Sequence, residues 1–257
     1  MGVINVTPDS FSDGGVHLRV EAAVTAAWAM LDCGAAIVDV GGESTRPGSD
    51  GVTAHEELER IEQVLLDLTG APVSVDTSKA AVAVRALELG VELVNDVTAL
   101  RADPELAGVV ADAGCYLCLM HMQGKPRTMQ IDPTYDDVVS DVKRFLEERL
   151  AFAVAAGIRE ELVCLDPGIG FGKTVAHNVE LVRRLGELAA IGRPLLVGLS
   201  RKSSLGKLTG GPDATVGSAA ASVGGAVSAF LRGASILRVH DVREHVEALA
   251  VASAVAG

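Results

Sequence analysis

The sequence lacks the features that mark membrane, secreted and multidomain proteins. No apolar run reaches the roughly 18 residues that a membrane-spanning helix needs, and the N-terminus does not resemble a signal peptide. No linker rich in Pro, Gly or Ser and no low-complexity tract divides the 257 residues. We therefore expect a single domain over residues 1–257 that resides in the cytoplasm and has no membrane partner.

Cysteine is scarce as well. The four cysteines, at positions 33, 115, 118 and 164, do not suggest a disulfide framework and fit a reducing compartment. Cys115 and Cys118 form a CxxC pair, but they lie in a strand-like run, where the odd spacing directs their side chains to opposite faces. We predict core packing for them and no shared metal.

Positive charge is in deficit. Lys and Arg number 22 against 34 Asp and Glu, which gives a net charge of -12 and a pI near 4.9. Most of such a surface would repel the phosphate backbone of a nucleic acid, so we expect no nucleic-acid partner. Any anionic ligand must be bound by a local cluster of cations.

Short apolar segments, each followed by a helical pattern, recur along the chain. The expected strands are 2–6, 36–40, 73–75, 92–95, 116–120, 163–165, 195–198 and 236–239. The expected helices are about 21–33, 54–69, 78–89, 103–113, 135–156, 175–190, 202–208 with 217–232, and 241–254. Eight strand-helix units in roughly 250 residues predict an α/β protein with the (β/α)8 TIM-barrel fold. An open doubly wound sheet is the alternative, because periodicity alone does not close a barrel.

Residues able to carry chemistry gather at the last positions of the expected strands. They are Asn5, Asp39, Asp76, Asn95, Met120 with His121, Asp166, Lys202, and Arg238 with His240. In a parallel barrel these strand ends share one rim, and that rim carries the active site. Any one of them could merely cap the next helix, but eight coincidences are improbable. By contrast, we predict surface positions without a role for the histidines at 17, 55, 177 and 245.

Two chemically distinct clusters follow from this placement. Three carboxylates (Asp39, Asp76 and Asp166) would repel one another unless a neutral or cationic group lay between them. Together with the Asn95 amide, they suit a flat heterocycle rich in N–H donors, because ionised carboxylates only accept hydrogen bonds. Divalent-metal binding is the competing interpretation, which the neighbouring Lys202 disfavours.

The second cluster is cationic. It contains Arg46, Lys202 and Arg238 with the N–H donor His240, a set that suits a phosphate or pyrophosphate. Asn5 with Asp13 could add a Mg²⁺ that keeps several waters and bridges the phosphates.

The run LVGLSRKS predicts a strand that ends at a helix start. Lys202 would then be a fixed cation facing a pocket, and Ser203 would lie where helix N–H groups bind a small carboxylate. An ordinary turn with solvated charges is the alternative. The run DPGIGFGKT, in contrast, fits neither a Walker A loop nor a dinucleotide fingerprint, because its glycine spacing is wrong for both.

Eight motifs occur in order at or near the strand ends. They are NVTPDSFSDGG from Asn5, VDVGGESTRPG from Val38, VSVDTSK from Val73, NDV from Asn95, LMHMQGKPRTMQ from Leu119, LDPGIGFGKT from Leu165, LVGLSRKS from Leu196 and RVHDV from Arg238. Together they resemble the motifs of the dihydropteroate synthases, a family of pterin-binding TIM-barrel enzymes. The resemblance implies an alkyl transferase of folate biosynthesis that joins 6-hydroxymethyl-7,8-dihydropterin pyrophosphate to 4-aminobenzoate and releases pyrophosphate and 7,8-dihydropteroate.

The resemblance also implies a role for each matching residue. The implied pterin site is Asp39, Asp76, Asn95, Met120, Asp166 and Lys202. The implied pyrophosphate site is Asn5, Arg238 and His240, with Mg²⁺ as cofactor on Asn5 and Asp13. The implied 4-aminobenzoate subsite is Phe11, Thr45, Arg46, Pro47, Phe171 and Ser203. We expect catalysis to depend on Asn5, Asp76, Lys202 and Arg238, with Asp76 stabilising a pterin cation, and we expect a homodimer through late helices such as 217–231.

Two departures from the family pattern accompany the resemblance. The sequence begins at the first expected strand, without the short segment that often covers the barrel floor, so we expect lower stability. The stretch 212–218 lacks an Arg that the family often carries before Gly-Ser. The alternatives are a pterin-dependent methyltransferase, which has no use for the pyrophosphate cluster, and a non-catalytic pterin-binding protein, which would have lost Asp76, Lys202 or Arg238.

Overall fold

Eight short parallel strands form the centre of the molecule in the computed structural model, which describes residues 1–7, 16–44, 49, 51–124 and 128–256. They are β1 (Gly2–Asn5), β2 (Val38–Gly41), β3 (Val73–Asp76), β4 (Leu93–Asp96), β5 (Tyr116–Met120), β6 (Val163–Asp166), β7 (Leu196–Val197) and β8 (Ile236–Leu237). Most of their residues are buried, as expected for parallel strands covered on both faces. All eight agree with the expected strands to within two residues at each end.

The strands close into a ring. β1 to β6 are hydrogen-bonded in sequence order, and β7 pairs with β8. Single parallel bridges join Leu165 to Leu195 and Gly2 to Val239, so β6 meets β7 and β8 meets β1. Val3 N–H donates to the Val239 carbonyl at 3.1 Å across this last junction. The TIM-barrel prediction is confirmed, and the open doubly wound sheet was wrong.

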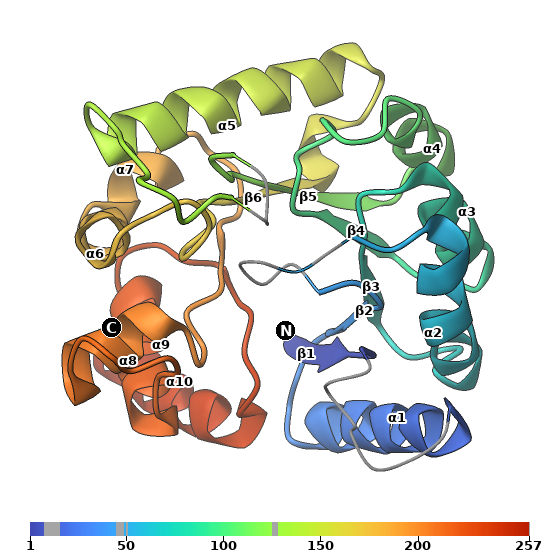
Figure 1. The fold of residues 1–257 in the computed structure, drawn as a ribbon, viewed down its shortest axis with the longest axis horizontal. Coiled ribbons are helices and arrows are strands. Elements are labelled where there is room, and N and C mark those ends of the chain that lie inside the picture. Colours follow the sequence, from blue (N-terminus) through green and yellow to red (C-terminus); the bar gives the residue numbers. More distant parts are fainter. Residues whose placement is uncertain (8–15, 45–48, 50, 125–127, 257) are drawn as a thin grey trace.

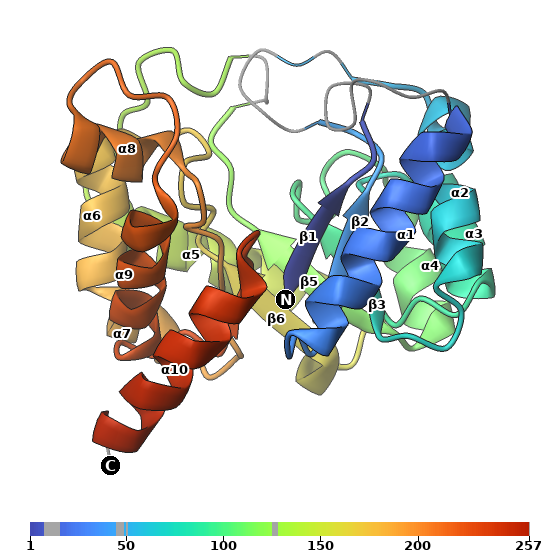
Figure 2. The same ribbon diagram turned by 90° about the horizontal axis from the view of Figure 1, so that it is seen from below.

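Helices surround the strands on the outside of the ring (Figures 1 and 2). They are α1 (Val16–Asp32), α2 (Ala54–Asp67), α3 (Ala80–Glu88), α4 (Leu106–Ala113), α5 (Val138–Ala155), the 3-10 turn η1 (Glu160–Leu162), α6 (Val175–Arg183), α7 (Leu185–Ala189), α8 (Ser203–Gly210), α9 (Ala219–Phe230) and α10 (Val242–Ala256). Thr53 is the N-cap residue of α2, and Thr174 is the N-cap residue of α6. Each forms a capping box, in which its side chain accepts a hydrogen bond from the backbone N–H three residues later. The expected helix 175–190 is two helices, because the chain breaks at Arg184.

The main core lies between the strands and the helices, where Leu117, Leu119 and Leu165 are fully buried. A smaller cluster inside the ring contains Cys118 and Cys164, which face each other across β5 and β6. Cys115 instead packs against the outer core, so the two members of the CxxC pair do face opposite sides. Among the described residues, no group of three or more His, Cys, Asp or Glu side chains is placed to hold a metal ion.

Two histidines differ from the surface prediction. His245 is only 2% exposed, and its Nδ1 lies 2.6 Å from the Asp241 carbonyl oxygen in the first turn of α10. His177 is half-buried, and its ring contacts Tyr135 edge-on at 5.0 Å. Both lie in first helical turns. His177 Nδ1 accepts the Thr174 N–H, one of the N–H groups that a helix start leaves unpaired, whereas the Asp241 carbonyl beside His245 already accepts the His245 backbone N–H. No helix in the described part of the chain combines the length and the apolarity that crossing a membrane requires.

Candidate active site

The carboxyl ends of the strands form the rim of the barrel, and the strand register sets neighbouring side chains level with one another there. Asn5 pairs with Gly41, Gly41 with Asp76, and Asp76 with Asn95. On the other side of the ring, Met120 pairs with Asp166. Residues from six different strands thus reach one opening, as the position of polar residues in the sequence predicts.

A guanidinium lies between two of the predicted carboxylates. Arg238, just after β8, donates from Nε to Asp39 Oδ2 at 2.6 Å and from Nη2 to Asp76 Oδ2 at 2.8 Å. The Arg238 side chain is 22% exposed, while that of Asp39 is fully buried. Burial disfavours the charged form of Arg238, but the attraction of Asp39 and Asp76 outweighs this effect, so the pKa of Arg238 is raised. The sequence grouped Arg238 with the phosphate-binding cations, whereas in the structure its side chain is hydrogen-bonded to two members of the carboxylate cluster.

Asp39 accepts hydrogen bonds from three side chains. Its Oδ1 accepts from Ser74 Oγ at 2.6 Å, and its Oδ2 accepts from Asn95 Nδ2 at 3.1 Å in addition to Arg238. These donors come from β3, β4 and the end of β8, so Asp39 holds three neighbouring parts of the rim in register. A fully buried carboxylate with this many donors is fixed in place.

Asp76 and Asp166 are less well satisfied. Desolvation raises the pKa of Asp76 to about 7; Arg238 opposes the shift, while Asp39 and Glu57 add to it. Desolvation also raises the pKa of Asp166 to about 6. This rise is opposed by the backbone N–H of Gly168, which donates to Asp166 Oδ1 at 2.6 Å, and by the positive charge of Lys202, which attracts the carboxylate. Each carboxylate therefore gains from a ligand that brings N–H donors.

Lys202 lies on the opposite wall of the rim, as the N-cap residue of α8. Its Nζ lies 4.2 Å from the centre of the Phe171 ring, a cation–π contact. Phe171 in turn packs against an apolar cluster of Val97, Met120, Met122 and Met129. Met120 therefore contributes to an apolar floor under Phe171. Ser203 is exposed at the first turn of α8, where unpaired helix N–H groups lie.

The seventh and eighth strand ends are bound to each other. Ser200 Oγ accepts the backbone N–H of His240 at 3.1 Å and lies 3.1 Å from His240 Nδ1. Arg201, whose φ is 58°, donates to Asp241 Oδ1 at 2.6 Å. Desolvation and the charges of Arg201 and Arg238 lower the pKa of His240 to about 4, so its imidazole is neutral near pH 7. Sequence analysis assigned no partner to Ser200 and no role to Arg201 or Asp241.

Some of the predicted site residues lie outside the described residues. These are Phe11, Asp13, Thr45, Arg46 and Pro47. The residues that precede 45–47 are held by side-chain contacts. Arg60 donates to the Gly42 carbonyl at 2.7 Å, and Lys79 forms ion pairs with Glu43 and with the fully buried Glu57. This anchor was missed in the sequence because it joins residues from two loops and a helix.

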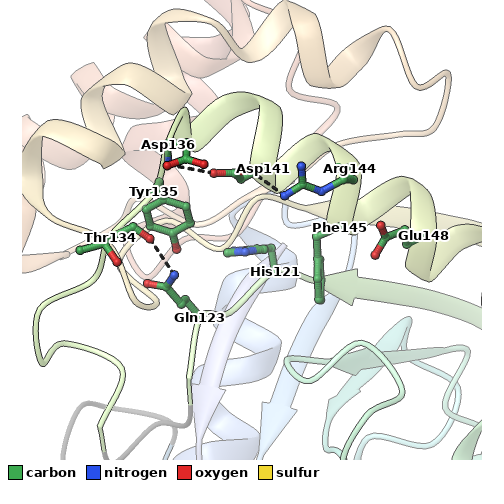
Figure 3. Close-up of a pocket in the computed structure, with 9 residues that line it drawn as sticks. All are labelled: His121, Gln123, Thr134, Tyr135, Asp136, Asp141, Arg144, Phe145 and Glu148. Atoms are coloured by element: carbon green, nitrogen blue, oxygen red, sulfur yellow. Dashed lines mark hydrogen bonds and ion pairs between the residues drawn. The ribbon is translucent and has the colours of Figure 1, made fainter.

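A separate hollow of about 450 Å³ lies outside the rim, between the segment after β5 and helix α5 (Figure 3). Its lining includes His121, Tyr135 and Phe145, with Asp141 and Arg144 paired at 2.7 Å on its edge. None of the predicted substrate-binding residues lines it. The rim, not this hollow, holds the convergent carboxylates and cations.

Comparison with known proteins agrees with this geometry. A family described as pterin binding enzyme matches residues 1–240. A dihydropteroate synthase from Neisseria meningitidis serogroup C is 48% identical over 254 residues, which cover 97% of this chain and 89% of that protein. The Xanthomonas albilineans dihydropteroate synthase structure with 4-aminobenzoic acid has a TM-score of 0.91 at 47% identity, covering 99% of this chain and 92% of that one. A structure of the synthase from that organism in complex with 7,8-dihydropteroate has a TM-score of 0.88 at 45% identity, covering the same shares of the two chains.

Proposed function

This chain belongs to the pterin-binding enzymes, and to the dihydropteroate synthases among them, and on this basis we propose how its rim carries the reaction. The enzyme condenses 6-hydroxymethyl-7,8-dihydropterin pyrophosphate with 4-aminobenzoate, giving 7,8-dihydropteroate and pyrophosphate. The observation that carries the proposed site is the position of Arg238 between Asp39 and Asp76. It supports a site in which the cation for a leaving anion would lie directly beside the acceptors for an N–H-rich ring.

The pterin ring binds among Asp76, Asn95 and Asp166, over the floor formed by Met120. Its N–H donors supply what the two carboxylates lack, because both have pKa values raised by desolvation. Lys202 offers donors to the acceptor atoms of the ring from the opposite wall. Asp39, which already accepts three hydrogen bonds, orients Asn95 and Arg238 more than it binds the ligand itself.

The pyrophosphate binds at Arg238 and His240, near Asn5. Guanidinium has five N–H donors, and the bonds to Asp39 and Asp76 use two of them, so the fork also has donors to offer phosphate oxygens. His240 is neutral near pH 7 and offers a ring N–H rather than a charge. Arg238 therefore supplies a fixed positive charge beside the pyrophosphate. This charge stabilises the negative charge that builds up on the pyrophosphate as it leaves.

Asn5 fits a Mg²⁺ site of the kind that takes few protein ligands. It is half-buried at the end of β1, level with Gly41 and Asp76, and its amide offers an oxygen. Mg²⁺ keeps several waters and needs one or two protein oxygens beside the phosphates, which Asn5 and Asp13 would provide. Bound there, the ion would neutralise charge on the pyrophosphate. Activity is expected to fall on treatment with EDTA and to return with added Mg²⁺.

The carbon–oxygen bond to pyrophosphate breaks first, and the electron pair leaves with the pyrophosphate. The resulting positive charge spreads over the pterin, where the Asp76 carboxylate stabilises it. The amine of 4-aminobenzoate then forms the new carbon–nitrogen bond and loses a proton to water. Such a reaction depends on electrostatic stabilisation and positioning more than on a strong base.

4-Aminobenzoate binds beside Phe171, with its carboxylate at the start of α8. Ser203 and the unpaired N–H groups of that first turn suit a carboxylate, and the helix dipole adds to the attraction. The segments that contain Phe11 and Thr45–Pro47 complete this subsite. The anchor at Gly42 and Glu43 fixes where the second of these segments leaves the barrel.

Pyrophosphate release tests the proposed function. The purified protein is given the pterin pyrophosphate and Mg²⁺, with and without 4-aminobenzoate. Release that requires both substrates, with dihydropteroate formed in equal amount, supports the synthase. Tight pterin binding without release would instead support a non-catalytic pterin-binding protein.

A homodimer is proposed through the late helices. α9 packs between α8 and α10, and all three lie together on one side of the barrel (Figures 1 and 2). The apolar side chains Leu208, Val216 and Leu231 next to α9 are 57%, 61% and 54% exposed. Exposed apolar side chains at both ends of α9 leave apolar surface on this side of the barrel that a second copy could cover. Sedimentation at micromolar concentration that shows only a monomer would contradict the dimer.

A further inference from the structure

A buried lysine lies behind the rim, in the run DPGIGFGKT that matches no phosphate-binding motif. Lys173 is 3% exposed, and its Nζ is 2.8 Å from His121 Nδ1, 3.0 Å from the Gly168 carbonyl and 2.9 Å from the Phe171 carbonyl. A lysine ammonium has three donors, and here it has three acceptors within 3.0 Å and a fourth, the His121 carbonyl oxygen, at 3.5 Å. Desolvation and the charge of Lys173 lower the pKa of His121 to about 2, so the imidazole is neutral and its Nδ1 accepts.

The loop that Lys173 binds is held closely against the end of β5. Gly168 has a φ of +67°, and a Cβ there would overlap the His121 carbonyl oxygen, so only glycine allows this approach. Further along, Gly170 N–H donates to Asn178 Oδ1 at 2.8 Å, and Tyr135 Oη donates to the Gly172 carbonyl at 2.7 Å. The backbone of 168–172 is thus fixed from several sides.

The 168–172 loop also contacts the Lys202 side chain. The Phe171 ring lies 4.2 Å from Lys202 Nζ, and a Cβ at Gly170 would stand 3.3 Å from Lys202 Cδ. The outer part of the Lys202 side chain, from Cδ to Nζ, therefore lies against the loop. A shift of the loop moves the Lys202 ammonium relative to Asp166.

Burial of Lys173 is unfavourable for folding in itself. Desolvation lowers its pKa to about 7, and the attraction of Asp166 only partly offsets the shift. An apolar side chain of similar size at such a position is often neutral or stabilising. A lysine retained here is therefore better explained by a role in activity than by stability.

We propose that Lys173 is a positioning residue: by joining the 168–172 loop to His121, it holds Phe171 and Lys202 in place to bind the pterin substrate. The inference rests on the proposed function of the rim. It adds to that function a residue that contacts no substrate and acts through its neighbours.

The first test compares Lys173→Met with Lys207→Met, which makes the same change on the exposed face of α8. Calorimetry measures the Kd for the pterin pyrophosphate without turnover. We expect Kd to rise roughly tenfold in Lys173→Met and kcat/KM to fall at least as much, because small displacements of a positioning group cost one to two orders of magnitude. Lys207→Met should stay within about twofold of wild type. Wild-type affinity in Lys173→Met would overturn the inference.

The second test alters the acceptor and distinguishes positioning from general instability. His121→Asn places an oxygen where Nδ1 lies, whereas His121→Leu has nearly the same shape without an acceptor. We expect His121→Asn to remain within about threefold of wild-type affinity and His121→Leu to match Lys173→Met, since an unmet charged donor is costly. Equal affinities in the two variants would overturn the inference. A wild type that binds the pterin but releases no pyrophosphate would instead refute the proposed function, while the difference between the two variants in Kd would still support positioning.

Discussion

Replacing Asp39 by Asn should move the pH dependence of the reaction to lower pH. The amide keeps the shape and an acceptor for Arg238 Nε, and Ser74, whose hydroxyl can rotate, can accept from the new NH2 group. The hydrogen bonds therefore survive, and the main change is the loss of one negative charge. That charge is one of the causes that raise the pKa of Asp76.

The size of the shift follows from the arrangement around Arg238. Two unit charges separated by roughly 6 Å, a spacing typical of two carboxylates bound to different nitrogens of one guanidinium, repel by about 3 kcal/mol at an effective dielectric constant near 20. That energy corresponds to about two pKa units. Because water and protein relax around the charges, we expect the pKa of Asp76 to fall from about 7 by one to two units, roughly.

The assay is kcat/KM for the pterin pyrophosphate between roughly pH 5 and 9, at saturating 4-aminobenzoate. Ionised Asp76 is the form that stabilises the cation, so wild-type activity is present above about pH 7 and is lost as pH falls through that value. In Asp39→Asn the midpoint of the pH profile should lie below roughly pH 6, whether or not the maximal kcat/KM also changes. Asp213→Asn, an exposed change of the same kind, is the control and should leave the midpoint in place. An unchanged or higher midpoint in Asp39→Asn would refute the coupling of the two carboxylates through Arg238.

Three other substitutions test separate parts of the site. Asp76→Asn should lower kcat by about 10²-fold or more while changing pterin affinity less. It should also raise the melting temperature at pH 8, an advantage that shrinks towards pH 4, because a carboxyl whose folded pKa is raised loses stability as pH rises from its unfolded to its folded pKa. Arg238→Ala should chiefly weaken binding of the pyrophosphate substrate. It should also lower the free energy of urea unfolding by about 3–5 kcal/mol, since Asp39 and Asp76 lose a buried counterion. Equal effects of Asp76→Asn and Arg238→Ala on kcat and on pterin affinity would contradict the division of roles. Lys79→Met should raise KM for 4-aminobenzoate about tenfold with pterin Kd unchanged, because it releases Glu43 at the base of the 45–47 segment, and a matching rise in pterin Kd would show that the anchor serves the whole rim.

The architecture was predictable from the sequence because a parallel barrel repeats one simple pattern. Each buried strand is short and apolar, each helix follows within a few residues, and polar residues begin where the strand ends. That is enough to place Asp39, Asp76 and Asp166 at one rim, because the ends of parallel strands meet there whatever their exact register. The helix break at Arg184 was missed, because one helical pattern continues across both pieces.

The partners across the rim could not be predicted in the same way. Arg238 and Asp39 are 199 residues apart, and whether their side chains touch depends on the tilt and closure of the barrel. The position of Lys173 depends on a glycine in a left-handed conformation at Gly168, which brings the loop back onto His121. Comparison with known motifs led only to the rejection of two phosphate loops. A lysine that follows the glycine-rich run GIGFG carries no signal of burial by itself.

Proton release on ligand binding would show that the substrate completes the site. Near pH 7 Asp76 is about half protonated and Asp166 holds a smaller fraction of a proton, because desolvation raises both pKa values. A pterin ring brings N–H donors that favour the ionised carboxylates, so binding lowers both pKa values and releases up to about half a proton from Asp76. Calorimetry of pterin pyrophosphate binding at pH 7 in buffers of different ionisation enthalpy measures this number. Asp76→Asn should remove most of the release, and proton uptake by the wild type would mean that the ring does not bind as a donor to these carboxylates.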